Sequence, residues 1–184
     1  KLPFIPGQTY RRSAIHDEYG GNRQSGIAPC KRRPWIFIFS GGKGATHGYR
    51  DQWENRNVFS YTGEGQDGDM EFTRGNLALR DHREKGRRVF LFEYVRTGFV
   101  TFVSELILYD CDYFETHDTN GRNRIGIKFF FHRAGIQPEV GSRELDLMPS
   151  RVALYPDPLS PSPHLNQVED PGAIYDYMRP TLTE

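Results

Sequence analysis

The residues best suited to hold a planar ligand lie between positions 49 and 62. Tyr49 and Tyr61 are twelve positions apart, Asp51 lies between them, and Thr62 follows directly. If the intervening chain folds back, the two rings could stack on both faces of a planar group while Asp51 accepts a hydrogen bond from an exocyclic amine. An extruded cytosine needs this combination, because its edge presents the N4 amine. Tyrosines beside a strand also occur in cores and rims, so the spacing alone leaves both interpretations open.

Three segments partly match motifs for other ligands, a dinucleotide or a calcium ion, but the residues around each do not fit the motif. Residues 63–68 (GEGQDG) match G-x-G-x-x-G, but a β-rich segment follows where a helix should begin, which favours a glycine-rich turn. Residues 110–112 (DCD) and 118–121 (DTNG) resemble the start of calcium loops. The first lacks the glycine and the second lacks the later acid that such loops need. We interpret them as a strand end and a hairpin turn.

The histidines and cysteines predict no catalytic or metal centre. None of the six histidines forms an HExxH motif, and the two cysteines, Cys30 and Cys111, form no Cys-x-x-C pair. A G-x-S-x-G nucleophile elbow is also missing from the sequence. We therefore expect no catalytic residue, no metal and no cofactor in this segment.

Charge is distributed unevenly along the chain. The 24 basic and 24 acidic residues cancel to a net charge of zero, but residues 1–50 carry +7. Residues 51–100, 101–150 and 151–184 carry −1, −3 and −3. One basic face could therefore contact a polyanion while an acidic face points away from it. A solvated mixture of charges is the plainer alternative.

The elements that must position these residues are mostly strands. Runs rich in β-branched and aromatic residues predict strands at 35–39, 57–62, 88–96, 98–110 and 125–133. Asn120-Gly121 predicts the hairpin turn before the last of them. With 14% aromatic residues, the pattern indicates an α+β fold built on a curved, partly closed β-barrel with one or two flanking helices.

Helix and domain boundaries follow from capping residues and prolines. One helix is expected over 73–86, capped by Thr73 or Asn76 and ended by Gly86, and a shorter one over 149–154 or 173–178. We expect one domain over residues 1–150 and a Pro-rich linker or strap over 151–184, because 155–172 holds five of the twelve prolines. No apolar run reaches the roughly 20 residues of a membrane span and no signal peptide is visible, which predicts a soluble, intracellular domain without a membrane partner.

Three motifs in order carry a resemblance to a known family. Residues 49–51 (YRD), 61–65 (YTGEG) and 75–79 (GNLAL) match the Y-x-D, Y-T-G-S-G and T-N-x-A-L-A segments of the SRA (SET- and RING-associated, YDG) domain. Residues 10–13, 16–17 and 19–27 look like the opening strand and loop of its bacterial branch. The sequence is most similar to the N-terminal SRA-like modules of bacterial modification-dependent HNH restriction endonucleases, over roughly residues 5–135.

This resemblance implies a PUA-like barrel that binds duplex DNA and flips a 5-methyl- or 5-hydroxymethylcytosine into a pocket. By position, Tyr49 and Tyr61 would stack on the base, Asp51 would meet its polar edge, and Thr62 would lie beside the 5-substituent. The acid stands two residues after Tyr49 here, whereas the family acid usually comes three after, at Gln52. Either Asp51 reaches the base or Gln52 takes part, and Trp53 could then replace one stacking ring.

The long finger loop of eukaryotic relatives is shortened here to 66–73, so another segment must fill the space that a flipped base leaves. Our candidate is the basic loop 19–33, with Arg23 and Gln24 near its tip. Basic side chains of the N-terminal region would contact the DNA backbone, where they add salt-dependent affinity without sequence information. The full predicted DNA-contacting set is Arg11, Arg12, Arg23, Gln24, Lys31, Arg32, Arg33 and Lys43.

The expected partner is double-stranded DNA with a modified cytosine, and the expected location is the bacterial cytoplasm, at the nucleoid. A C-terminal nuclease domain outside this chain is expected as well, and oligomers could form through it. Two alternatives stay open: a PUA-like RNA-binding module and a non-catalytic protein-interaction barrel. The sequence leaves open which 5-modification, flanking sequence or strand state would be preferred.

Overall fold

The computed structural model describes residues 2–41 and 51–136, which belong to a compact unit spanning Lys1–Pro138. Its elements are β1 (Thr9–Arg11), α1 (Arg12–Tyr19), β2 (Ile27–Pro29), β3 (Trp35–Ser40), β4 (Gln52–Trp53), β5 (Val58–Thr62), α2 (Arg74–Arg80), β6 (Arg88–Arg96), β7 (Phe99–His117) and β8 (Asn123–Arg133). The expected α+β fold, mostly strand with two helices, is confirmed.

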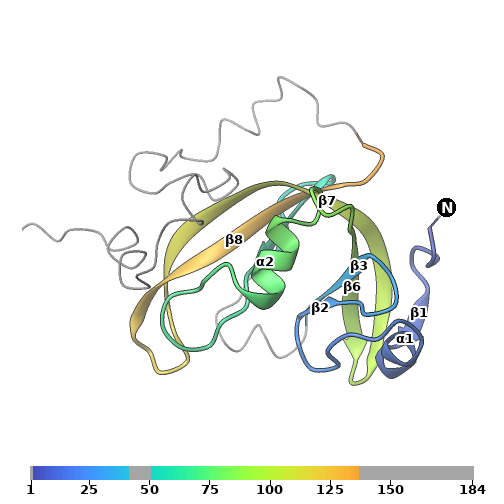
Figure 1. Cartoon of the computed structure of the whole chain (residues 1–184), viewed down its shortest axis with the longest axis horizontal. Coiled ribbons are helices and arrows are strands. Elements are labelled where there is room, and N and C mark those ends of the chain that lie inside the picture. Colours follow the sequence, from blue (N-terminus) through green and yellow to red (C-terminus); the bar gives the residue numbers. More distant parts are fainter. Residues whose placement is uncertain (1, 42–50, 137–184) are drawn as a thin grey trace, which may run out of the picture. The chain divides into compact units, whose positions relative to one another are not determined.

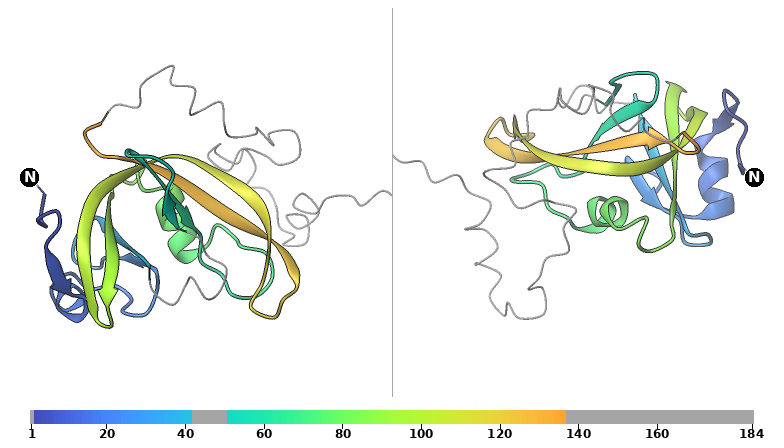
Figure 2. Two further views of the ribbon diagram at one scale, coloured as in Figure 1. Left: turned by 180° about the vertical axis from the view of Figure 1, so that it is seen from behind. Right: turned by 90° about the horizontal axis from the view of Figure 1, so that it is seen from above.

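All eight strands belong to one open, curved sheet. Its order is β2-β3-β6-β7-β8-β5-β4, with β1 paired to β7, and only the β3–β6 pair is parallel among the described strands. Register shifts at Leu91/Phe92 and Leu108/Asp110 mark irregularities of the kind that bend a sheet. Figure 1 shows β7 and β8 arching over α2, and the views in Figure 2 show the same curvature from behind and from above.

The five predicted strands are confirmed as β3, β5, β6, β7 and β8. The strand β7 continues beyond the predicted end at 110 to His117, where it pairs in register with Asn123 across the predicted hairpin turn. Its last part alternates buried and half-exposed side chains, with Cys111 and Tyr113 buried. Polar residues at the intervening positions hide this half-buried strand in the sequence.

The helices differ more from expectation. The helix predicted over 73–86 ends at Arg80, and hydrogen-bonded turns continue to Gly86, which has a φ of 61°. Thr73 is the N-cap residue but makes no side-chain capping hydrogen bond. The opening strand expected near residues 10–13 corresponds to β1 (Thr9–Arg11), whereas no prediction covered α1 or β2. The helices expected at 149–154 or 173–178 and the boundary at 150 lie outside the described residues.

An aromatic core fixes the end of the sheet where β1, β3, β6 and β7 meet. Phe37, Phe90, Phe92 and Phe102 are fully buried, and Phe4 packs edge-on against the first three. Edge-to-face aromatic pairs add about 0.5–1.5 kcal/mol each beyond their buried area. This packing supplies a rigid base for the β6–β7 hairpin. None of the described helices is long and apolar enough to cross a membrane.

Candidate functional site

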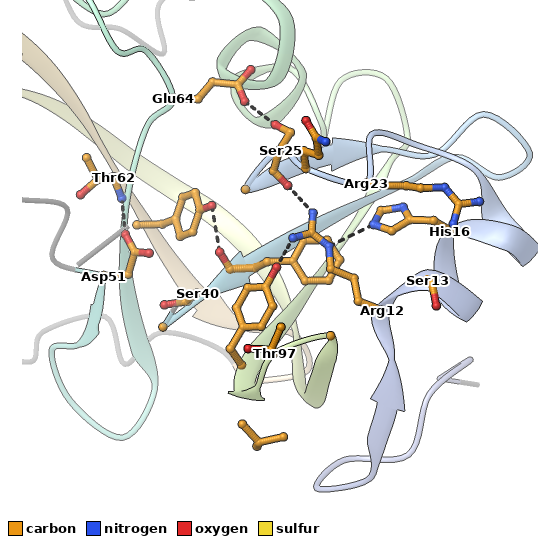
Figure 3. Close-up of a pocket in the computed structure, with 18 of the residues that line it drawn as sticks. Arg12, Ser13, His16, Arg23, Ser25, Ser40, Asp51, Thr62, Glu64 and Thr97 are labelled. Carbon is orange, nitrogen blue, oxygen red and sulfur yellow. Dashed lines mark hydrogen bonds between the residues drawn. The ribbon is translucent and has the colours of Figure 1, made fainter. Parts of the chain in front are cut away.

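A cavity of about 950 Å³ opens beside this core. Its described walls come from α1 with the following loop, the ends of β3 and β5, and the β6–β7 hairpin. Figure 3 shows Asp51 and Thr62 on one side, His16 and Arg23 on the other, and Thr97 below. The site therefore combines segments that are far apart in sequence.

Asp51 supplies a half-buried acid to the cavity. The antiparallel pairing of β4 with β5 places it next to the end of β5, where the Thr62 N–H donates to its Oδ1 at 2.9 Å. Burial raises the pKa of Asp51, although the Thr62 hydrogen bond and the charge of Lys128 oppose this shift. Protonating Asp51 therefore costs less than protonating an aspartic acid in water.

Thr62 continues this polar wall, and Lys128 contacts Thr62 without lining the cavity itself. Register pairing of β5 with β8 sets Thr62 opposite Lys128, whose Nζ donates to Thr62 Oγ1 at 3.2 Å. Burial lowers the pKa of Lys128, and the nearby Asp51 charge opposes that change. Lys128 escaped the sequence analysis because only the β5–β8 register brings it here.

Of the other predicted base-binding residues that the structure describes, Tyr61 lines the cavity, whereas Gln52 and Trp53 do not. Tyr61 is 4% exposed, lines the cavity, and donates its hydroxyl to the Phe39 carbonyl at 3.3 Å. Tyr49 lies outside the described residues. Gln52 and Trp53 do not line the cavity: Gln52 is exposed, and Trp53 packs on Phe59 with Nε1 donating to Glu93. The structure thus brings Asp51, Tyr61 and Thr62 together.

Arg12, a predicted phosphate contact, is a buried residue of the cavity wall. Its side chain stacks on Phe39, with 3.9 Å from Cζ to the ring centre, and donates to the Ser25 carbonyl at 2.6 Å. It also donates to His16 Nε2 at 3.2 Å and to the hydroxyl of Tyr94. Arg12 therefore ties the loop before β2 to both α1 and β6.

Glu64 anchors the same loop from the other side. Its carboxylate accepts hydrogen bonds from Ser25 Oγ and from the N–H of Gly75, both at 2.8 Å. The side chain of Asn76 accepts from the Glu64 N–H and donates to the Glu64 carbonyl, also at 2.8 Å. A Cβ on Gly75 would lie only 2.5 Å from Glu64 Oε1, so glycine allows this close approach. The glycine-rich turn and α2 are therefore joined by side chains of two predicted motifs.

The remaining predicted DNA contacts occupy different surroundings. Arg23 and Gln24 line the cavity, and Arg23 pairs with Asp17. Arg32 donates to the carbonyls of Asp17 and Glu18 at the end of α1, each at 2.8 Å. Three others do not line the cavity and are exposed: Arg11 near Phe99, Lys31, and Arg33 near Trp35. Lys43 lies outside the described residues.

Sequence analysis missed the β6–β7 hairpin as part of this site. Tyr94, Val95, Arg96, Thr97 and Gly98 all line the cavity. The available signal was a turn, Arg-Thr-Gly, between two apolar strands, with Gly98 at a φ of 78°. No group of three His, Cys, Asp or Glu suited to a metal ion occurs within residues 2–41 and 51–136.

Comparison with known proteins identifies related folds. The family model described as "ScoMcrA-like, SRA domain" matches residues 6–145. The sulfur-binding and SRA domains of ScoMcrA, complexed with phosphorothioated DNA, match with a TM-score of 0.58 and 22% identity over 72% of this chain and 40% of that chain. The SUVH5 SRA domain with hemi-methylated CG DNA matches with a TM-score of 0.53 and 25% identity, over 77% of this chain and 96% of that chain. The chain thus spans less than half of the ScoMcrA chain, and no curated protein matches it.

Proposed function

The chain belongs to the ScoMcrA-like SRA domain family, and on this basis we propose that it binds duplex DNA and takes a flipped 5-modified cytosine into the cavity between Asp51 and Arg12. The observation that carries the proposal is the Asp51–Thr62 wall within that cavity. The SUVH5 SRA domain is known in complexes with methylated and with hydroxymethylated CG DNA. That relative supports the choice of ligand.

The chemistry of the wall fits a cytosine edge. Cytosine presents an amine donor at N4 beside a ring-nitrogen acceptor at N3. Asp51 can accept from N4, and its raised pKa lowers the cost of placing a proton on the carboxyl oxygen that would donate to N3. Extruding a base costs a few kcal/mol, so these hydrogen bonds and stacking must offset that cost. A methyl group in an apolar niche then adds only about 1–3 kcal/mol of discrimination.

The decisive measurement is binding to identical duplexes that carry cytosine, 5-methylcytosine or 5-hydroxymethylcytosine at one position. We expect roughly 10- to 200-fold tighter binding to at least one modified duplex, as a contact of one methyl group allows. A phosphorothioated duplex and a structured RNA serve as competitors. Equal affinity for all duplexes, or tighter binding to either competitor, would contradict the proposal.

The parent protein is proposed to be a modification-dependent restriction endonuclease of the HNH class, with this segment as its targeting module. ScoMcrA is described as a phosphorothioation-dependent restriction endonuclease, which supports a nuclease partner domain. We expect this chain alone to leave methylated plasmid intact in the presence of Mg²⁺ or Mn²⁺. Cleavage by the isolated chain would contradict its role as a targeting module.

A further inference from the structure

The β6–β7 hairpin forms one rim of the cavity, and the proposed base contacts at Asp51 and Thr62 belong to other segments. Residues 95–98 are exposed and line the cavity, and Figure 3 shows Thr97 at this edge. Gly98 takes a φ of 78° in the turn, a conformation that favours glycine. The strands on either side are fixed by the buried aromatic core, so the hairpin presents its side chains from a rigid support.

Two guanidinium groups share one aromatic ring at the base of this hairpin. Arg96 Cζ lies 4.2 Å and Arg11 Cζ 5.7 Å from the centre of the Phe99 ring. Register explains the arrangement, because Phe99 on β7 pairs with Arg11 on β1 and with Arg96 on β6. Cation–π contacts of this kind contribute about 0.5–1 kcal/mol at exposed sites and restrict the side chains they hold.

These two arginines differ from the others around the cavity. Arg12 is buried in its hydrogen-bond network, and Arg23 pairs with Asp17. Arg11 and Arg96 are exposed, and neither forms a salt bridge with any carboxylate in the described part of the chain. Their charges are therefore available to an anionic ligand.

We propose that Arg96 and Arg11, held together by Phe99, bind neighbouring phosphates of the DNA strand beside the flipped nucleotide. This inference rests on the proposed function and adds a backbone contact at the β6–β7 hairpin, where Arg96 lines the cavity and Arg11 lies beside it outside the lining. The planar guanidinium matches two phosphate oxygens at once, and its fixed position lowers the entropy lost on binding. Such contacts hold the duplex in register over the cavity without reading its sequence.

The test compares the double variant Arg11→Gln/Arg96→Gln with the control Arg56→Gln/Arg83→Gln, which removes two exposed arginines that do not line the cavity. Dissociation constants are measured for modified and unmodified duplexes from about 50 to about 200 mM salt. Each lost phosphate contact reduces the slope of log K against log salt by about 0.9. We expect a reduction of about 2 for the double variant and none for the control, with an unchanged ratio between the two duplexes.

Phe99→Leu provides a second variant that keeps both charges. We expect it to retain the salt slope while weakening both duplexes several-fold, because the arginines lose their common support. Thermal unfolding identifies any variant that has merely lost its fold. A double variant that folds and keeps the wild-type slope would overturn the inference, as would a loss confined to the modified duplex. Failure of the wild type to prefer modified DNA would overturn the proposed function alone, because the slope is also measured on unmodified duplex.

Discussion

Under the proposed function, Asp51 is the residue at which ligand recognition and protein stability oppose each other. Its carboxyl group must leave water to line the cavity, and burial raises its pKa. The Thr62 N–H holds one oxygen in place at 2.9 Å, so the group is oriented before any base arrives. The same burial that prepares Asp51 for a hydrogen-bonding ligand makes its ionised form costly in the folded protein.

Replacing Asp51 with alanine should weaken binding to modified duplex by about 10-fold or more, because a hydrogen bond to a charged or ionisable group contributes about 1.5–3 kcal/mol. Binding to unmodified duplex should change little. Gln52→Ala is the comparison, since its side chain is exposed outside the cavity. Competition titrations measure both effects. Equal losses on both duplexes would exclude Asp51 from the base contact, and a larger effect of Gln52→Ala would assign that role to Gln52.

The raised pKa of Asp51 also predicts a pH-dependent stability. The Asp51 carboxyl binds a proton more readily in the folded state than in the unfolded chain. Its contribution to the free energy of unfolding is therefore fully present below pH 3.8 and is lost as pH rises through the folded pKa. Asp51→Asn removes that loss. Its free energy of unfolding relative to wild type should therefore be more favourable at about pH 7 than at about pH 4. Urea unfolding at the two pH values measures the difference, and no change between them would contradict the expectation.

At the scale of elements, α2 and the turns after it are connected to the sheet by buried polar side chains. His82 is 3% exposed, accepts a hydrogen bond from the Leu108 N–H at Nε2, and hydrogen-bonds to the Arg87 carbonyl through Nδ1. Glu64 and Asn76 connect the start of α2 to the glycine-rich turn. The helix is only seven residues long, so these contacts rather than helix propensity hold it in place.

His82 should make the fold sensitive to acid. Burial lowers the pKa of His82 below 6.5. Its contribution to the free energy of unfolding is therefore present above pH 6.5 and is lost as pH falls from there through the folded pKa. Protonation then removes the Nε2 acceptor for the Leu108 N–H. His82→Gln should reduce the decline in unfolding free energy between about pH 7 and about pH 5. The exposed His117→Gln is the control. An unchanged decline in His82→Gln would argue against this role.

Gly75→Ala should destabilise the junction between α2 and β2. The added Cβ would lie 2.5 Å from Glu64 Oε1 and 2.8 Å from the Cβ of Ile27, so the structure must shift. Overpacking of this kind costs about 1–3 kcal/mol. Chemical denaturation should show that loss, and the loop held by Glu64 should become more accessible to protease. Wild-type stability in the variant would mean that the junction adapts without cost.

At the scale of the whole molecule, the net charge of +7 over residues 1–50 overstates the positive charge that is available to DNA. Arg12 is buried, Arg23 pairs with Asp17, and Arg32 contacts carbonyls at the end of α1. The cations that remain exposed without such partners include Arg11 and Lys31. Non-specific affinity for DNA should therefore be modest, since few phosphates can be neutralised.

Lys31→Gln tests this charge surface. We expect weaker binding to modified and unmodified duplex alike, with a salt slope smaller by about 1, because a phosphate contact carries no sequence information. Arg32→Gln is the comparison, since its hydrogen bonds to α1 carbonyls give it a structural role that should also lower stability. A Lys31→Gln variant with an unchanged slope would place its side chain away from the DNA.

Elements specified by their own residues could be predicted from the sequence, whereas elements that depend on long-range pairing could not. The long apolar strands β3, β6 and β8 were predicted because their residues alone favour extended structure. The short strand β1 was expected only from the family resemblance and β2 was missed, because both exist only through pairing with β7 and β3. The three-residue group Asp51, Tyr61 and Thr62 was found through a motif. The cavity rim at 95–98 was not, because long-range strand pairing brings it there.

The anchoring of Ser25 has a consequence for binding kinetics. Arg12 donates to its carbonyl and Glu64 accepts from its hydroxyl, so the loop before β2 is held in a defined geometry without any ligand. A loop that is ordered in advance adds no slow folding step to association. The association rate should therefore rise linearly with DNA concentration and fall with salt, and differences between modified and unmodified duplexes should be found in the lifetime of the complex.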